Sequence, residues 1–475
     1  MQETKRFYSS LSLLILLNVI IKPLWIFGID RQVQNEVGLS EYGVFFSIWN
    51  LSIVLLFLLD WGLTVFYNQQ LSAKNRSIAE QAGSFIFVKL IFGLLYISII
   101  FCIGIFTGID RWDLVIYVIL VQVLSSMFVF FRAIITSQQW FRTDAWLSIL
   151  DKLLMIALCG ILLYYPSWFG GISIEKFLLL QITCMVFALL AALTILLVRK
   201  FHFTFKKLWP EKQIFNAALP FAVIVLLMSF HSRIDGFILE RIGGAKEAGR
   251  YAAAYRLLDA ANMLGVLLAT FLLPYITRQW SEGKDISKVV LNIRHLLITA
   301  AVSLSCIAIF LAPWLHGVLY QHDEAGSVAI LQWCIPALIG YSLIQVYGTV
   351  LTATGHITAF SYITLVSVIV NLLLNFLLIP SMGAKGSCIA ALISQGISGI
   401  ATIWYARQKL HIAIDMASIL IYIFTGGLLC GFLYLSRDWI LNKLLIIIGA
   451  GAISLFVLLI TRLIDLKSWK ISLRN

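Results

Sequence analysis

The sequence predicts an all-α, polytopic membrane protein with about fourteen transmembrane helices. Apolar segments of about twenty residues fill almost the whole 475-residue chain, and each can cross the roughly 30 Å hydrocarbon core of a bilayer. Hydrophobic residues make up 61% and charged residues 12% of the chain, and the mean hydropathy is +0.94. Soluble domains carry about twice that charged fraction, so this composition excludes a water-soluble globular protein.

The positions of the helices follow from the apolar segments. We expect spans at 9–29, 43–66, 83–106, 114–137, 147–165, 176–198, 213–241, 250–277, 292–315, 326–353, 357–380, 383–407, 414–436 and 441–462. Since the first span is too long for the apolar part of a signal peptide, no cleavable one is expected.

The even number of spans puts both termini on one side of the membrane. Lys and Arg collect on that side, as in Arg278, Lys284, Lys288 and Arg294 after the eighth span. By the positive-inside rule this side is the cytoplasm. The membrane itself is expected to be the inner (plasma) membrane. The same bias explains the net charge of +12 without a nucleic-acid partner.

The longest basic connection, residues 199–212, divides the chain. It is a cytoplasmic linker between an N-terminal six-helix bundle, 1–198, and a C-terminal six-helix bundle, 213–410. Residues 411–475 then form two extra helices and a cytoplasmic tail. An internal repeat supports the division, because 38–43 and 244–249 both read G-x-x-E-x-G before equivalent spans. The halves are therefore related by an axis along the membrane normal.

Ionisable residues inside the expected spans are the candidate functional residues, because each costs roughly 2.5–3.5 kcal/mol to insert. By span direction, one group falls toward the external half of the membrane: Lys22, Arg233, Asp235, Arg256 and Asp259. A second group falls toward the cytoplasmic end: Asp60, Lys89, Arg132, Asp151 and Lys152. A charged side chain does not face lipid comfortably, so these helices are expected to line a shared cavity.

The two groups have different charge balances. The external group has one more cation than anion, which favours an anionic ligand bound by Lys22, Arg233 and Arg256. The cytoplasmic group is nearly balanced, and either a salt-bridge network or snorkelling to the interface would explain it. Together with Asp235 and Asp259, that group is interpreted as the charge network of the cavity. Pro23 predicts a bend in the first span, either for packing or as a moving joint.

Other site types are not indicated. The seven cysteines lie in or beside apolar segments without metal-ligand spacing, so neither a metal site nor a cofactor is expected. No paired-carboxylate loop, H-E-x-x-H motif, nucleophile elbow or P-loop is present in the sequence. We therefore expect that this protein is not an enzyme.

Several of these segments resemble the multidrug/oligosaccharidyl-lipid/polysaccharide exporter superfamily, and within it the polysaccharide (O-antigen type) flippase branch of Bacteroidetes-type members. Residues 21–31, 38–43 and 59–63 are similar to the first helical hairpin of that family. Residues 353–356, Asn371, Asn375, 379–386 and Ala390 are similar to its tenth-to-twelfth helix signature.

The resemblance implies two six-helix bundles in a V around a central cavity, alternating access, and a substrate of sugar chain, pyrophosphate and polyprenol. Lipid II flippases of the superfamily carry cations in the first and eighth helices. Lys22 and Arg256 occupy comparable helices here, without a matching local motif.

The leading hypothesis is therefore a flippase for a lipid-linked oligosaccharide of O-antigen or capsule type. One alternative is a cation-coupled multidrug exporter of the same fold, although Lys22 stands where such exporters carry a carboxylate in the first helix, and Asp30 lies at its rim. Another is a membrane-embedded polymerase, ligase or glycosyltransferase, which would need a larger loop to hold a donor sugar. The sequence leaves open whether H+, Na+ or the membrane potential drives transport.

Overall fold

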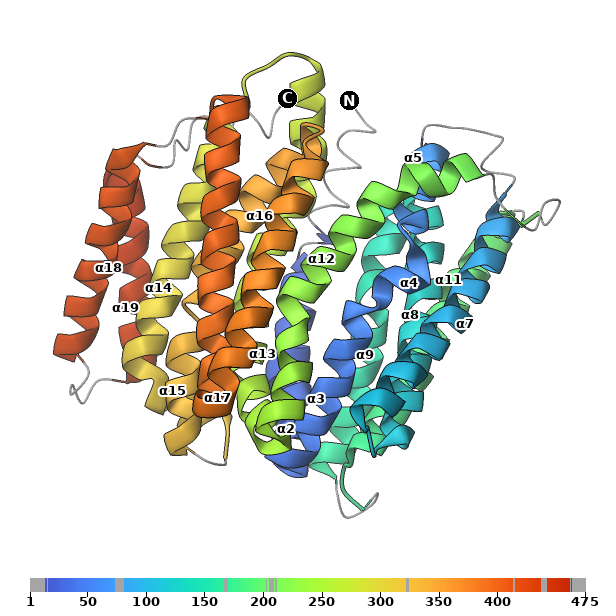
Figure 1. The fold of residues 1–475 in the computed structure, drawn as a ribbon, viewed down its shortest axis with the longest axis horizontal. Coiled ribbons are helices and arrows are strands. Elements are labelled where there is room, and N and C mark those ends of the chain that lie inside the picture. Colours follow the sequence, from blue (N-terminus) through green and yellow to red (C-terminus); the bar gives the residue numbers. More distant parts are fainter. Residues whose placement is uncertain are drawn as a thin grey trace. The chain divides into compact units, whose positions relative to one another are not determined.

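The computed structural model describes residues 13–14, 16–72, 81–165, 170–201, 203–204, 209, 212–321, 324–412, 415–436, 442–461 and 463. In these residues the protein is all-α: helices and turns, without a strand. The chain forms two compact units, Met1–Gly249 and Arg250–Asn475. Figure 1 shows long helices running side by side within each unit.

The described part of unit 1 contains α-helical residues at 16–23, then a π-helical segment and a series of α-helices. They are η1 (Leu24–Asp30), α2 (Arg31–Val37), α3 (Leu39–Val54), α4 (Leu56–Asp60), α5 (Leu63–Ser72), α7 (Ala82–Thr107), α8 (Trp112–Ser137), α9 (Phe141–Tyr164), α11 (Ile174–Val198) and α12 (Lys212–Gly243). Helix α11 packs on α8 and α9, and α12 packs along α3. Because α12 contacts α3, α4 and α5, it belongs to unit 1, although the sequence assigned it to the C-terminal bundle. The two-bundle boundary at 199–212 stays a prediction.

The first span passes through Pro23 without ending. Residues 16–23 are α-helical, and the helix then widens into the π-helical segment η1. Proline lacks the backbone N–H of an α-helix, and π-helical turns occur often at functional sites. The helix thus becomes π-helical directly after Pro23, and the expected bend stays a prediction.

Unit 2 contains the remaining helices. They are α13 (Ala245–Ser281, from Arg250 onward), α14 (Ser287–Leu319), α15 (Glu324–Cys334), α16 (Ala337–Ala353), α17 (Ile357–Leu410), α18 (Met416–Ser436) and α19 (Lys443–Ile460). Helix α14 is central, because α15, α16, α18 and α19 all pack against it.

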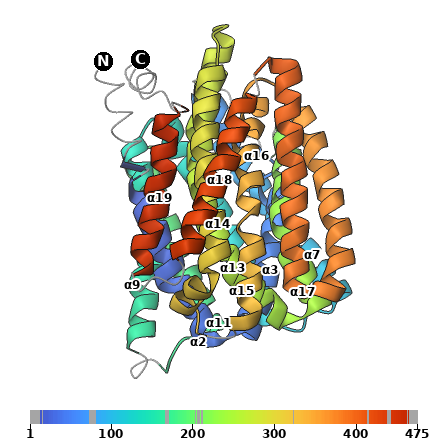
Figure 2. The same cartoon turned by 90° about the vertical axis from the view of Figure 1, so that its left-hand side faces the viewer.

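The two C-terminal helices pack on α14 (Figure 1, Figure 2). They do so through a shared apolar cluster and two polar contacts. Leu311, Leu429 and Leu433 belong to the cluster and are at most 3% exposed. The hydroxyls of Ser303 and Ser454 lie 2.6 Å apart. The Sγ atoms of Cys306 and Cys430 lie 3.7 Å apart, and both cysteines are free thiols.

Eleven helices in the described part of the chain are long and apolar enough to cross a membrane. One of them, the 54-residue α17, holds two expected spans because it turns sharply at Gly383, where φ is 54° and ψ is −135°. The expected span 43–66 is instead built from α3, α4 and α5, which are interrupted at Leu55 and at Trp61. Residues 9–12 of the first span lie outside the described residues, and the count of about fourteen stays a prediction.

The G-x-x-E-x-G repeat is a reciprocal helix crossing inside unit 1. Gly38 (φ 84°) and Gly244 (φ 88°) precede α3 and α13 in the left-handed region that favours glycine. A Cβ on Gly43 would lie 1.9 Å from the carbonyl oxygen of Ala245. A Cβ on Gly249 would lie 2.0 Å from that of Leu39, which is the residue equivalent to Ala245 in the other repeat. The second glycine of each repeat therefore lets the other helix approach.

Candidate functional site

A buried ion pair holds the interrupted second span to α7. The Lys89 side chain is 1% exposed and pairs with Asp60, the last residue of α4. Asp60 also accepts hydrogen bonds from the backbone N–H of Thr64, at 3.2 Å, and from its hydroxyl. Asp60 thus caps the start of α5 after the left-handed break at Trp61. These two residues of the expected network are brought together.

A second group of charges surrounds Lys22, and we call it the Lys22 cluster: Lys22, Arg132, Asp144, Asp151 and Lys152. Lys152 pairs with Asp151 at 3.1 Å and lies 4.9 Å from the ring centre of Trp25. Arg132 donates from Nε and Nη2 to the two carboxylate oxygens of Asp144, at 2.7 and 3.1 Å. Lys22 interacts electrostatically with Arg132, Asp151 and Lys152.

Lys22 is the unpaired member of this cluster. Among the described residues it forms no ion pair and donates no hydrogen bond, whereas both carboxylates already have a partner. The cluster therefore contains three cations and two carboxylates. Lys22 is also partly exposed.

The expected separation of Lys22 from the cytoplasmic group is wrong. It assumed that the fifth span begins near residue 147, whereas α9 begins at Phe141. Asp151 and Lys152 lie ten residues into α9, which is about 15 Å along a helix. They therefore lie deep enough to interact with Lys22.

The remaining candidates lie on α12 and α13. Arg233 and Asp235 belong to unit 1, with Asp235 2% exposed, and Arg256 and Asp259 belong to unit 2. Each of the four is engaged in an interaction within the protein. Their assignment as ligand or network residues therefore rests on position and charge, and it stays a prediction.

Two charged groups were missed as site features. Asp144 was overlooked because it lies outside the expected span, although it follows Arg132 by twelve residues across a short turn. Arg111 joins three helices of unit 1 by pairing with Glu41 of α3, Asp113 of α8 and Glu175 of α11. Hydrogen bonds to Asp113 and Glu41 raise the pKa of the Arg111 guanidinium above its ordinary value.

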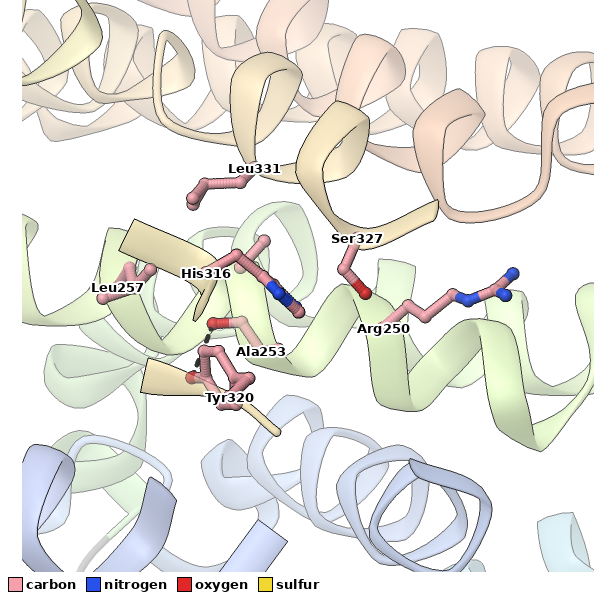
Figure 3. A pocket seen from close by; sticks show the side chains of 8 residues that line it. Arg250, Ala253, Leu257, His316, Tyr320, Ser327 and Leu331 are labelled. Atoms are coloured by element: carbon pink, nitrogen blue, oxygen red, sulfur yellow. Dashed lines mark hydrogen bonds between the residues drawn. The ribbon is translucent and has the colours of Figure 1, made fainter. Parts of the chain in front are cut away.

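A small depression in unit 2 is filled by its own side chains (Figure 3). Arg250, His316, Tyr320 and Ser327 line it, and the Tyr320 hydroxyl donates to the carbonyl of Ala253 at 3.0 Å. It leaves no room for a bound molecule. No group of three or more His, Cys, Asp or Glu in the described ranges could hold a metal ion.

Comparison with known proteins identifies a relative that is named as a probable flippase of glycan biosynthesis. Over 404 residues the chain is 23% identical to a protein of Haloferax volcanii named probable low-salt glycan biosynthesis flippase Agl15, covering 81% of this chain and 80% of that one. A family model named MatE matches residues 220–377.

Two solved structures are similar in fold. The lipid II flippase MurJ, in an inward closed conformation, matches with a TM-score of 0.71 over 94% of this chain and 97% of its own, at 14% identity. An inward-facing multidrug resistance MATE family transporter matches with a TM-score of 0.65 over 84% of this chain and 94% of its own, at 14% identity.

A family model described as polysaccharide biosynthesis protein matches residues 8–280, more than half of the chain. It spans the hairpin motifs, the linker and every residue of the Lys22 cluster. The chain is thus a multi-pass membrane protein that belongs to the polysaccharide biosynthesis protein family.

Proposed function

We propose that this protein flips a polyprenyl-pyrophosphate-linked oligosaccharide, an O-antigen or capsule-type repeat unit, across the membrane by alternating access. The observation that carries the proposal is the Lys22 cluster, in which one partly exposed lysine lacks a carboxylate partner among the described residues. A pyrophosphate supplies the negative charge that this cluster lacks. The flippase relative and the family match support the same substrate class.

The cluster suits recognition of a phosphate group at the head of a lipid. Arg132 and Lys152 raise the local positive potential but are held by Asp144 and Asp151. Lys22 can therefore bind an oxyanion without breaking an existing pair. A bound pyrophosphate would also relieve the repulsion among the three cations, so binding and neutralisation occur together.

Arg233 and Arg256 would contact the substrate during passage, and Asp235 and Asp259 would hold them in place. Both termini would lie in the cytoplasm of an inner-membrane protein, with transport driven by H+, Na+ or the membrane potential. We also propose that the chain is organised as two six-helix bundles followed by two extra helices.

A second candidate is cation-coupled export of small amphiphiles by the same fold. The MatE match over 220–377 favours it, and so does Asp30, which is 3% exposed and accepts a hydrogen bond from the Tyr42 hydroxyl at 3.0 Å. A buried carboxylate beside a hydroxyl is suited to bind a proton or a metal cation.

The test is a flipping assay in proteoliposomes with a fluorescent undecaprenyl-pyrophosphate oligosaccharide and a membrane-impermeant quencher. We expect wild-type protein to expose the lipid at both leaflets. Lys22→Ala should lower the flipping rate about tenfold or more, the value of one charge-assisted contact. Lys22→Arg should retain part of the rate because it keeps the charge.

The control is Lys409→Ala, which removes an exposed lysine at the end of α17. It should flip at the wild-type rate. Equal rates for Lys22→Ala and wild type would contradict the role of the cluster. Efflux of a cationic dye without flipping of the oligosaccharide lipid would favour the second candidate instead.

A further inference from the structure

Arg294 is a buried cation of unit 2 that has no acidic partner among the described residues. It lies on α14, is 4% exposed, and donates from Nη1 to the Tyr347 hydroxyl of α16 at 3.2 Å. Its Nε and Nη2 atoms are buried and donate no hydrogen bond. The expected span 292–315 contains Arg294 near its start, and α14 begins earlier, at Ser287, so this residue lies seven residues after the start of the helix.

The groups around the guanidinium are neutral. The Tyr422 hydroxyl of α18 lies beside it and also contacts Nδ1 of His295. The carboxylate of Asp415 is used to cap α18, where it accepts from the backbone of Ala417 at 3.0 Å and from the Ser418 hydroxyl at 3.2 Å. In the described ranges no carboxylate pairs with Arg294. Arginine stays protonated, and an isolated buried charge is very unfavourable.

The free edge of Arg294 has the geometry of an oxyanion site. Nε–H and Nη2–H of a guanidinium point the same way and fit two oxygens of a carboxylate or phosphate. In this protein Arg132 uses that same pair of atoms to hold Asp144. Arg294 presents the same edge with no partner in the described part of the chain.

The surroundings favour a ligand that comes from the lipid. Tyr422, which lies beside the guanidinium, is only partly buried. The neighbouring surface of α18 is apolar, with Leu420, Ile423 and Phe424 each at least 63% exposed. Acyl chains that pack on this surface would leave a headgroup phosphate close to Tyr422, which lies beside the guanidinium.

We propose that the Nε/Nη2 edge of Arg294, between α14, α16 and α18, binds the phosphate of a membrane lipid. Rotation of Tyr422 opens the site, and the phenol of Tyr347 keeps the guanidinium oriented. The site lies in unit 2 and is independent of the Lys22 cluster, and so its failure would leave the proposed transport function untouched.

The test measures the unfolding temperature of delipidated full-length protein with three probes: phosphatidic acid, diacylglycerol with the same acyl chains, and inorganic phosphate. We expect phosphatidic acid alone to stabilise the wild-type protein. Arg294→Leu should weaken this response about tenfold or more in lipid concentration. Arg294→Lys should weaken it partly, because it keeps the charge and loses the fork.

Arg407→Leu is the matched control, since it removes an exposed arginine of unit 2 and should leave the response unchanged. Replacing a buried unpaired charge by an apolar side chain should not unfold the protein. If Arg294→Leu does unfold the protein, the response to phosphatidic acid is compared between Arg294→Lys and wild type only. An equal response of Arg294→Leu and wild type to phosphatidic acid would overturn the proposal. If inorganic phosphate or diacylglycerol raised the unfolding temperature of the wild-type protein but not that of Arg294→Leu, the assignment of the site to a lipid phosphate would be overturned.

Discussion

Lys89 and Arg132 each have a carboxylate partner inside unit 1, whereas Lys22 and Arg294 have none in the described part of the chain. In the apolar interior of a membrane protein, the presence or absence of a carboxylate partner distinguishes two roles for a buried cation. A paired cation holds helices together, and an unpaired one is available to an anion that arrives from outside.

The Asp60–Lys89 pair gives a direct test of the structural role. Asp60→Asn should leave the buried Lys89 ammonium without its partner and destabilise the protein on the order of 3–5 kcal/mol. The measurement is abundance in the membrane together with thermal unfolding in detergent. The double variant Asp60→Asn/Lys89→Met removes both charges and should recover most of the loss. Wild-type stability of Asp60→Asn would mean that this carboxylate, 28% exposed, is solvated instead of paired.

Single residues were partly predictable from the sequence. Lys22, Arg132, Asp151 and Lys152 were recognised because a charge within an apolar segment is conspicuous. Asp144 and Arg294 were not, because each lies near a helix end, where a charge usually contacts water. Only the true starts of α9 and α14, several residues earlier than hydropathy indicated, show that both are buried.

At the scale of the helices, the crossing of the two G-x-x-E-x-G segments fixes how α3 approaches the start of α13. Each contact is made by backbone atoms, which cannot move aside as a flexible side chain can. A methyl group on either glycine would therefore push the two helices apart.

Gly43→Ala or Gly249→Ala should sharply reduce the amount of folded protein, with a destabilisation of at least about 1–3 kcal/mol. Fluorescence-detected size exclusion and thermal unfolding would measure it. Gly160→Ala is the matched control, because a Cβ at Gly160 of α9 would meet nothing within 4 Å. If all three variants behave alike, the close crossing is not maintained in solution.

The repeat could be found from sequence because glycine and glutamate recur at the same spacing. The reciprocal contact between the two segments could not be found from sequence, because the residue pattern does not show which backbone atoms approach one another. The π-helical segment after Pro23 and the turn at Gly383 also depend on packing and not on hydropathy. Because the chain turns at Gly383 without leaving the helix assignment, α17 contains two of the expected spans.

At the scale of the whole molecule, apolar segment length determines the fold class, and the sequence predicted it directly. The grouping of helices was less predictable. Helix α12 packs along α3 in unit 1, and neither hydropathy nor charge encodes that preference, because the lipid-facing and helix-facing surfaces of a membrane helix are both apolar.

The charge distribution also predicts orientation. We expect a green fluorescent protein fused to either terminus to fluoresce, and alkaline phosphatase fused at Arg111 to be active, since Arg111 lies in a connection on the opposite side. Active phosphatase at the C-terminus would reverse the assignment of both faces, and with it the expected side from which substrate enters.

The adjacent sulfur atoms of Cys306 and Cys430 have a consequence for how the protein should be handled. Two free thiols at 3.7 Å need only a small approach to form a bond when a membrane-permeable oxidant is present. That bond would fasten α18 covalently to α14 in the native sequence. Preparations exposed to air could then hold a mixture of tethered and untethered molecules, and measurements of how α18 moves would require a reducing agent throughout.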